Sequence, residues 1–219
     1  MCYTPTCAMI GGAGRMPGDP KVLMLDVDGV VVTGRPADGL PWWTDLLTDL
    51  KLTKTALREA FFGPHWAQIV TGEAELMTHL RPALERIAPD LTAETLRDYW
   101  FAHDARLNEA LLAQVAALRE AGWAVHLATN QEHHRAKDLW HRLGLKTHAD
   151  SLIYSARLGV AKPDRAFFDR AARTVGAPPE TLTLIDDSAA NVVGARAAGW
   201  RAAQWQPGAD LARTLAQAT

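Results

Sequence analysis

Two aspartates that directly follow a short apolar run are the residues of this sequence best suited to chemistry. The apolar residues 22–25 lead into Asp26, Asp28 and Gly29. Such a run is typical of a strand buried on both faces, and the two-residue period of a strand places both carboxylates on one side of the chain. Two acids beside a glycine that lets the backbone approach a ligand can bind a cation and an anion together. The alternative is a turn that only closes a strand, because Asp and Gly are common turn residues.

Polar side chains also occur at three later places in the sequence. Two of these places follow a predicted apolar strand, and the third is the predicted start of a helix. The carboxyl ends of parallel strands share one edge of a sheet, so side chains far apart in the sequence can converge there. Four such places in one chain indicate a single site. The three later ones are Thr129-Asn130 and Asp186-Asp187, each after a predicted strand, and Lys162 beside Pro163 at a predicted helix start.

The order of the predicted elements indicates an α/β fold, a Rossmann-like parallel sheet with helices on both faces. From residue 123 onward, strands and helices alternate with short links. Between the first strand and the second lie about ninety residues, whereas one crossover needs only about thirty. We expect the additional residues, which have a helical pattern, to form a cap over the carboxyl edge of the sheet. Strands are predicted over residues 22–25, 123–128, 152–154, 181–185 and 201–205.

Three domains follow from this pattern. Residues 1–20 are a predicted flexible tail, residues 21–34 and 105–219 a predicted core, and residues 35–104 a predicted cap. Gly63-Pro64 is expected to break a helix, and Pro82 to kink or divide one. Helices are predicted over residues 42–50, 53–62, 72–88 and 108–120, after Thr92, through Leu143, from Lys162-Pro163, and over 191–198.

The set of motifs resembles that of the haloacid dehalogenase-like hydrolases. The resemblance covers roughly residues 21–205, and the position of the insert is similar to that of the subgroup with a helical cap between the first and second motifs. The matching residues are, in order, Asp26-Val27-Asp28-Gly29-Val30, Thr129-Asn130, Lys162-Pro163 and Asp186-Asp187.

This resemblance implies hydrolysis of a phosphate monoester with Mg²⁺. It implies that Mg²⁺ is held by Asp26, Asp186 and the backbone carbonyl of Asp28, with Asp187 in support, and oxygen ligands suit this hard ion. Asp26 is then the nucleophile that forms an aspartyl-phosphate. Asp28 is the general acid for the leaving alcohol and afterwards the base for water.

The resemblance also implies a phosphate-binding set. Thr129 and the amides of Asn130 and Gly29 are expected to bind phosphoryl oxygens, and Lys162 to neutralise their charge and contact Asp26. Each has a structural alternative, since Thr129 suits a helix N-cap and an isolated lysine is usually exposed. Ser188 and Asn191 suit either a helix cap or a role in supporting the metal ligands.

Three other functions share all or part of this pattern. Dehalogenating members of the family lack the second acid, so Asp28 favours phosphoryl chemistry. A sugar-phosphate mutase shares every motif residue, and a non-catalytic binding module is a third possibility, although loss of Asp26 or Asp28 is its expected signature. We therefore expect a phosphatase acting on a small phosphorylated metabolite, as a monomer or homodimer.

Composition excludes several other classes of protein. The 219 residues are 48% hydrophobic and carry a net charge of -2, which disfavours a dedicated nucleic-acid or anionic-membrane binder. No run reaches the roughly 18–20 apolar residues that span a bilayer, and no secretory signal is evident, so a cytoplasmic protein is expected. Cys2 and Cys7 are too few for a disulfide framework or a four-cysteine zinc site.

Aromatic residues of the predicted cap can either stack on a substrate or pack its core. Arg35 could reach a substrate oxygen. The adjacent His133 and His134 diverge on a helix, so we interpret them as a solvated helix start and not as a metal site. The aromatic and histidine set of the cap is Trp42, Trp43, His65, Trp66, Tyr99, Trp100 and His103.

Overall fold

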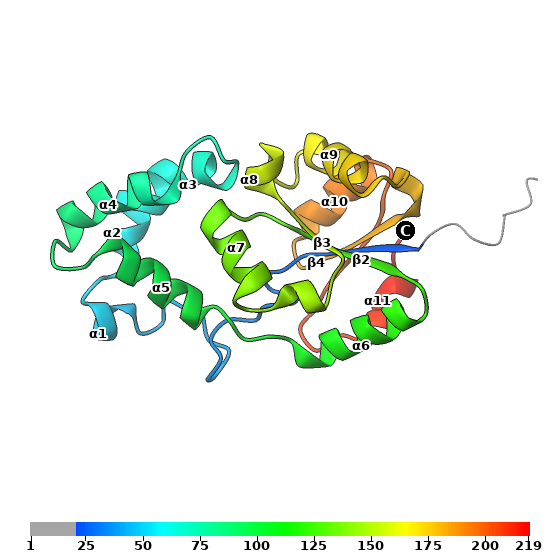
Figure 1. Ribbon diagram of the computed structural model, residues 1–219, viewed down its shortest axis with the longest axis horizontal. Coiled ribbons are helices and arrows are strands. Elements are labelled where there is room, and N and C mark those ends of the chain that lie inside the picture. Colours follow the sequence, from blue (N-terminus) through cyan, green and yellow to red (C-terminus); the bar gives the residue numbers. More distant parts are fainter. Residues whose placement is uncertain (1–20) are drawn as a thin grey trace, which may run out of the picture.

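A computed structural model describes residues 21–219 and contains a five-stranded parallel sheet (Figure 1). The strand order is β3-β2-β1-β4-β5, and every neighbouring pair is parallel. This confirms the predicted fold class. The expectations for residues 1–20, with Cys2 and Cys7, lie outside the described residues. The strands are β1 (Val22–Leu25), β2 (Ala124–Thr129), β3 (Ser151–Tyr154), β4 (Leu182–Asp186) and β5 (Arg201–Gln204).

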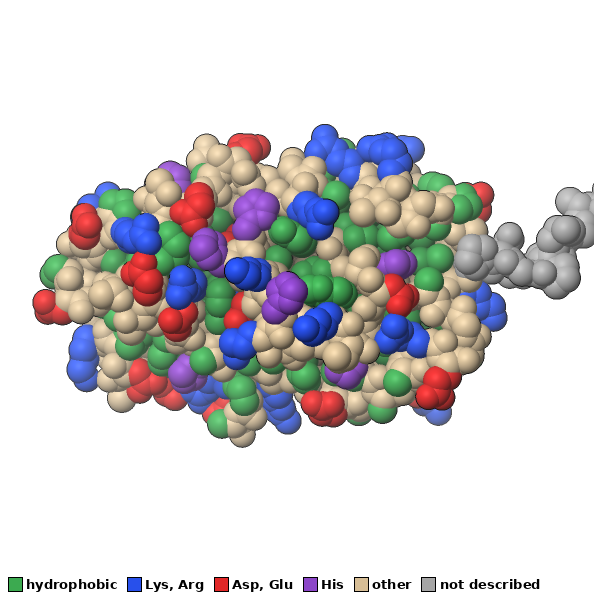
Figure 2. Space-filling model, in the orientation of Figure 1, with side chains coloured by type: hydrophobic (Ala, Val, Ile, Leu, Met, Phe, Trp, Pro, Cys, Tyr) green, Lys and Arg blue, Asp and Glu red, His purple; other side chains and the backbone are tan. Residues whose placement is uncertain are grey.

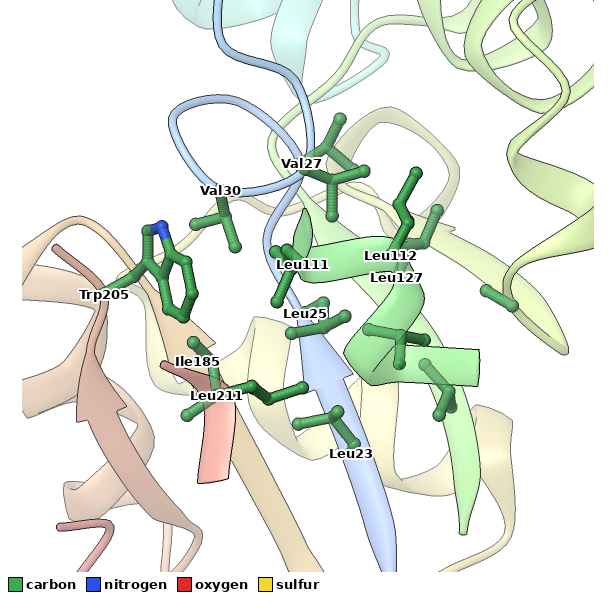
Figure 3. Close-up of a cluster of buried hydrophobic side chains, with 14 of the residues drawn as sticks. Leu23, Leu25, Val27, Val30, Leu111, Leu112, Leu127, Ile185, Trp205 and Leu211 are labelled. Atoms are coloured by element: carbon green, nitrogen blue, oxygen red, sulfur yellow. The ribbon is translucent and has the colours of Figure 1, made fainter. Parts of the chain in front are cut away.

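The central strand β1 is buried on both faces. Leu23 and Leu25 join an apolar cluster on one face, and Val22 and Met24 join a second cluster on the other. Helices α6 (Glu109–Glu120) and α11 (Leu211–Ala216) pack on the first face, and α9 (Arg165–Val175) and α10 (Ala189–Ala197) cover the second (Figure 1). Figure 3 shows the first cluster, in which Leu23, Leu25, Ile185, Leu111, Leu112 and Leu211 converge.

The remaining helices of the sheet domain are short, except for α7. They are α7 (His133–His141), α8 (Ser155–Leu158) and two 3₁₀ turns, η2 (Leu145–Thr147) and η3 (Pro179–Thr181). In the part of the chain that the structure describes, no helix has both the length and the apolar character needed to cross a membrane.

Several helices start after a residue whose side chain caps them. The start of α6 was predicted correctly, since the Asn108 side chain accepts a hydrogen bond from the Leu111 amide. The expectation that Lys162-Pro163 begins a helix was wrong: α9 starts at Arg165, because Asp164 caps it by accepting from the Ala166 amide. Thr129 is likewise not a cap, because Glu132 caps α7.

A helical insert, which contains the predicted cap of residues 35–104, lies between β1 and β2. Its own apolar cluster takes its buried members from residues 42–101, and among them are Leu46, Phe61, Leu80 and Trp100. Each of the two parts of the chain therefore has a separate apolar centre. The insert contains α1 (Leu46–Leu50), α2 (Lys54–Leu57), the π-helical turn η1 (Arg58–Phe62), α3 (Gly63–Val70), α4 (Leu76–Ile87) and α5 (Ala93–His103).

The helices of the insert differ from the sequence prediction at several positions. Gly63-Pro64 does not break the helix: α2, η1 and α3 follow one another without a gap. Pro64 cannot donate to the Ala60 carbonyl, and the Arg86 guanidinium donates to it instead at 3.3 Å. Helix α4 runs as one element through Pro82, so Pro82 does not divide it, and α4 and α1 begin at Leu76 and Leu46, both later than expected.

Polar contacts join the insert to the sheet domain. Ser155 Oγ donates to the Val70 carbonyl at 2.6 Å, and Glu75 Oε1 lies 2.7 Å from His134 Nε2. Helix α7 begins at the exposed His133, in agreement with the expected solvated helix start, and His134 in addition contacts the insert. Figure 2 shows basic and histidine side chains gathered on this face, over α7.

Candidate active site

Two adjacent strands place the carboxylates of the site. Leu25 and Ile185 are paired in the parallel register of β1 and β4, so Asp26 and Asp186 come next to each other at one sheet edge. One carboxylate oxygen from each of Asp26, Asp186 and Asp187 lies within 4.8 Å of the others. The predicted convergence of the first and last motifs is thus present in the structure.

Lys162 lies between these acids. It is 5% exposed, and its Nζ lies 3.0 Å from Asp26 Oδ1, 2.6 Å from Asp186 Oδ2 and 2.7 Å from the Ala128 carbonyl. The lysine is therefore buried, not solvated. Burial acts to lower the pKa of Lys162, but the charges of Asp26 and Asp186 outweigh it and hold the pKa above its ordinary value.

Asn130 holds the backbone of Lys162 in place. Its side-chain Nδ2 donates to the Lys162 carbonyl at 2.9 Å, and its Oδ1 accepts from the Lys162 amide at 2.8 Å. Such a two-point contact fixes both position and orientation. The Asn130 side chain thus links the ends of two motifs, a contact that the sequence did not indicate.

Asp186 is held by the start of α10. Asn191 Nδ2 lies 3.0 and 3.1 Å from the two carboxylate oxygens of Asp186, and the Ser188 amide donates to Oδ1 at 2.9 Å. The side chain of Ser188 forms no capping hydrogen bond. Asn191 and the Ser188 backbone therefore orient Asp186, which agrees with the supporting role among the two alternatives.

The acids of the site have raised pKa values. Burial raises the pKa of Asp26 to about 7; Lys162 opposes this, and the neighbouring Asp186 adds to it. Surrounding protein atoms partly desolvate the Asp28 carboxyl and so raise its pKa as well, and the charge of Asp104 raises this pKa further. Asp28 keeps an exposed surface, which limits the penalty for its charged form.

Gly29 is required by a close approach. Its φ is +77°, and a Cβ at this position would lie 2.1 Å from Asp187 Oδ2. Only glycine lets the loop after β1 pass beside Asp187.

Two residues near Asp28, Gln131 and Arg135, were not expected from the sequence. Gln131 is 3% exposed and donates through Nε2 to Asp28 Oδ2 at 2.5 Å. Arg135 is 1% exposed, its Nη2 lies 3.6 Å from Asp104 Oδ2, and its charge lowers the pKa of Asp28. In the sequence, only the position of Gln131 directly after Thr129-Asn130 indicated that it belongs to the site. Nothing in the sequence indicated this for Arg135.

These side chains surround a cavity of about 280 Å³. All of the predicted site residues line this cavity except Asp186. Asp186 lies beneath them and contacts Lys162. The lining residues are Asp26, Asp28, Gly29, Thr129, Asn130, Lys162, Asp187 and Asn191.

A family model described as haloacid dehalogenase-like hydrolase matches residues 20–199. The chain belongs to this family. No curated protein sequence gives a significant match.

Solved structures share the fold of this HAD-like hydrolase. A HAD family enzyme of Bacteroides thetaiotaomicron, in complex with magnesium and inorganic phosphate, is 17% identical, with a TM-score of 0.72 over 89% of this chain and 98% of that one. A HAD-like family hydrolase of Porphyromonas gingivalis is 19% identical, with a TM-score of 0.70 over 91% and 98%. A 2-haloacid dehalogenase of Pseudomonas syringae is 17% identical, with a TM-score of 0.62 over 87% and 88%.

None of the residues that line the cavity around Asp26 comes from the helical insert. Arg35, expected near a substrate, is 9% exposed, and its guanidinium pairs with Asp38 and Asp45. Most of the insert's aromatic side chains pack against one another. For example, Trp42 stacks on Trp100 with ring centroids 5.4 Å apart. The packing alternative therefore describes most of these rings.

Proposed function

We propose that this HAD-like hydrolase is a Mg²⁺-dependent phosphatase that acts on a small phosphorylated metabolite. The observation that carries the proposal is the presence of Asp28 in the same cavity as Asp26. A halide leaves carbon without a proton, but the alkoxide of a phosphate monoester is a poor leaving group and needs a general acid. A second carboxyl group beside the nucleophile supplies the proton donor that phosphoryl transfer needs and that displacement of a halide does not.

The donor set fits magnesium. Asp26, Asp186 and Asp187 offer three carboxylate oxygens within 4.8 Å of one another, and hard divalent cations prefer oxygen ligands. Lys162 supplies only one positive charge beside these three acids, which leaves an excess of negative charge for a cation to balance. These three residues, with the backbone carbonyl of Asp28, would hold Mg²⁺. When bound, the ion supplies charge neutralisation between the carboxylate nucleophile and the phosphoryl oxygens.

Asp26 and Asp28 divide the chemistry between them. In the first step an Asp26 oxygen forms a bond to phosphorus, the bond from phosphorus to the alcohol oxygen breaks, and Asp28 gives that oxygen its proton. In the second step water attacks the aspartyl-phosphate and transfers a proton to Asp28, which releases phosphate and restores the Asp26 carboxylate. Gln131 positions Asp28 through the hydrogen bond to Oδ2.

The other lining residues suit phosphate binding. The Thr129 hydroxyl and the amides of Asn130 and Gly29 supply donors, and Lys162 supplies charge. Because Asn130 and the two acids already fix Lys162, this charge needs no reorganisation during the reaction. The helical insert is proposed as a cap that closes over the substrate and excludes water.

Release of inorganic phosphate from a panel of sugar phosphates, nucleotides and p-nitrophenyl phosphate tests the proposal. We expect release with Mg²⁺, none with EDTA, and none from Asp26→Asn. Halide release from 2-haloacids is the parallel assay. Halide release without phosphate release would contradict the proposal, and so would isomerised sugar phosphate formed without hydrolysis.

A further inference from the structure

A second cavity, of about 300 Å³, lies inside the helical insert. We propose that it binds a small organic anion with an aromatic ring system. The volume lies at the lower end of the range of small-molecule sites, which are mostly apolar with a few polar groups at their edge. Its lining residues are Trp42, Trp43, Leu46, Lys54, Leu57, Arg58, Phe62, Trp66 and Trp100.

The aromatic wall of this cavity is built by rings that support one another. The ring of Trp100 lies 5.4 Å from that of Trp42 and 5.9 Å from that of Trp66, and Phe62 lies 5.4 Å from Trp66. Each ring is thus held by its neighbours, so the cavity is formed before a ligand arrives. Flat rings at such spacing favour stacking and edge contacts with another aromatic system.

The charged residues of the wall select an anion. Lys54 and Arg58 are its only charged lining residues, both are cations and both are exposed. Lys54 Nζ lies 3.9 Å from the ring centroid of Trp43, which keeps the ammonium at the edge of the apolar space. A carboxylate or sulfonate on an aromatic body matches this arrangement.

This cavity is separate from the catalytic one. The two share no lining residue. Helices α1 and α2, which contribute Leu46, Lys54 and Leu57, lie at the end of the insert away from the sheet (Figure 1). Trp43 is 36% exposed and opens the cavity to solvent. A ligand can therefore enter without passing the catalytic acids, and the inference does not depend on the proposed reaction.

The test compares two ligands of one shape, 2-naphthoate and its neutral counterpart 2-naphthamide. We expect saturable one-to-one binding of 2-naphthoate by calorimetry, about fivefold tighter than 2-naphthamide because of the two cations at the edge. The chain has eight tryptophans, so its indole N–H signals can be followed by NMR. Those of the four lining tryptophans should shift, with Trp43→Phe and Trp66→Phe giving assignments.

Two variants test the charge selection. The double variant Lys54→Met, Arg58→Met should bind both ligands equally. The exposed Lys146 of the sheet domain gives a matched control, and Lys146→Met should keep the preference for the anion. Asp26→Asn should bind 2-naphthoate with unchanged affinity.

Three results would overturn the inference. They are equal affinity of the wild-type protein for the two ligands, shifts confined to tryptophans outside the cavity, and competition between 2-naphthoate and inorganic phosphate. An absence of binding in a folded wild-type protein would overturn it as well.

Discussion

Replacing Arg135 with methionine should lower the free energy of unfolding by about 3 kcal/mol, a typical value for breaking a buried charge network. Arg135 lies on α7 and is 1% exposed. Its guanidinium donates to the Asp104 carbonyl, to the Phe101 carbonyl at 3.4 Å and to Asp138 Oδ2 at 3.1 Å. Methionine leaves these acceptors without their donor and removes the guanidinium, whose Cζ lies 5.2 Å from the centroid of the Phe101 ring.

The expected loss of unfolding free energy is at the lower end of the range for buried charge networks, because some of the acceptors of Arg135 have a second donor. Arg142 also donates to the Phe101 carbonyl, at 3.1 Å, and pairs with Asp138. Only the Asp104 carbonyl and carboxylate lose a partner that no other residue in the described chain replaces. One buried charged interaction of this kind contributes about 1.5–3 kcal/mol, and the volume lost on shortening the side chain adds to it.

Arg142→Met is the matched control. Arg142 contacts the same Phe101 carbonyl and Asp138, but its side chain is 53% exposed. Its replacement should therefore lower the free energy of unfolding by about 1 kcal/mol or less. Urea unfolding of both variants by linear extrapolation gives the two values. Equal losses for Arg135→Met and Arg142→Met, or a loss below about 1 kcal/mol for Arg135→Met, would refute the reasoning that burial decides the strength of these contacts.

Four further substitutions test the catalytic assignments. Asp26→Asn should abolish phosphate release while the thermal midpoint stays near that of the wild type, and substantial residual turnover would refute the assigned nucleophile. Asp28→Asn should lower kcat about 10²- to 10⁴-fold, the usual contribution of a general acid–base group; a near-normal rate would place that role elsewhere. Lys162→Ala should lower kcat/KM for phosphate esters, an expectation that an unchanged value in steady-state assays would contradict. Asn191→Ala should weaken Mg²⁺ binding about 10- to 100-fold in titration calorimetry, because it frees the carboxylate of Asp186; unchanged affinity would show that Asn191 does not orient it.

Local sequence patterns predicted the sheet and the convergence of its polar ends. Apolar runs such as residues 22–25 report burial on both faces, and the parallel arrangement then places Asp26 and Asp186 side by side. The family motifs added the grouping of Thr129 and Lys162 in the same cavity. These features depend on short-range periodicity and on the rule that strand ends share an edge.

Contacts between distant segments could not be predicted in the same way. The pairing of Gln131 with Asp28 depends on the path of the chain after β2, and the burial of Arg135 depends on where the insert packs. The helix through Gly63-Pro64 is a further case, because Arg86 replaces the hydrogen bond that Pro64 cannot make. A partner 26 positions away in the sequence leaves no local signal.

The two segments that connect the insert to the sheet domain are hydrogen-bonded to each other. The Thr33 amide donates to the Arg106 carbonyl at 2.9 Å, and the Arg106 amide donates to the Gly34 carbonyl at 2.9 Å. A movement of the insert must therefore carry both segments together. One segment begins five residues after Asp28 and the other follows Asp104, whose charge raises the pKa of Asp28. The closure proposed for the insert would therefore move the segment beside Asp104, and with it a charge that contributes to the raised pKa of Asp28.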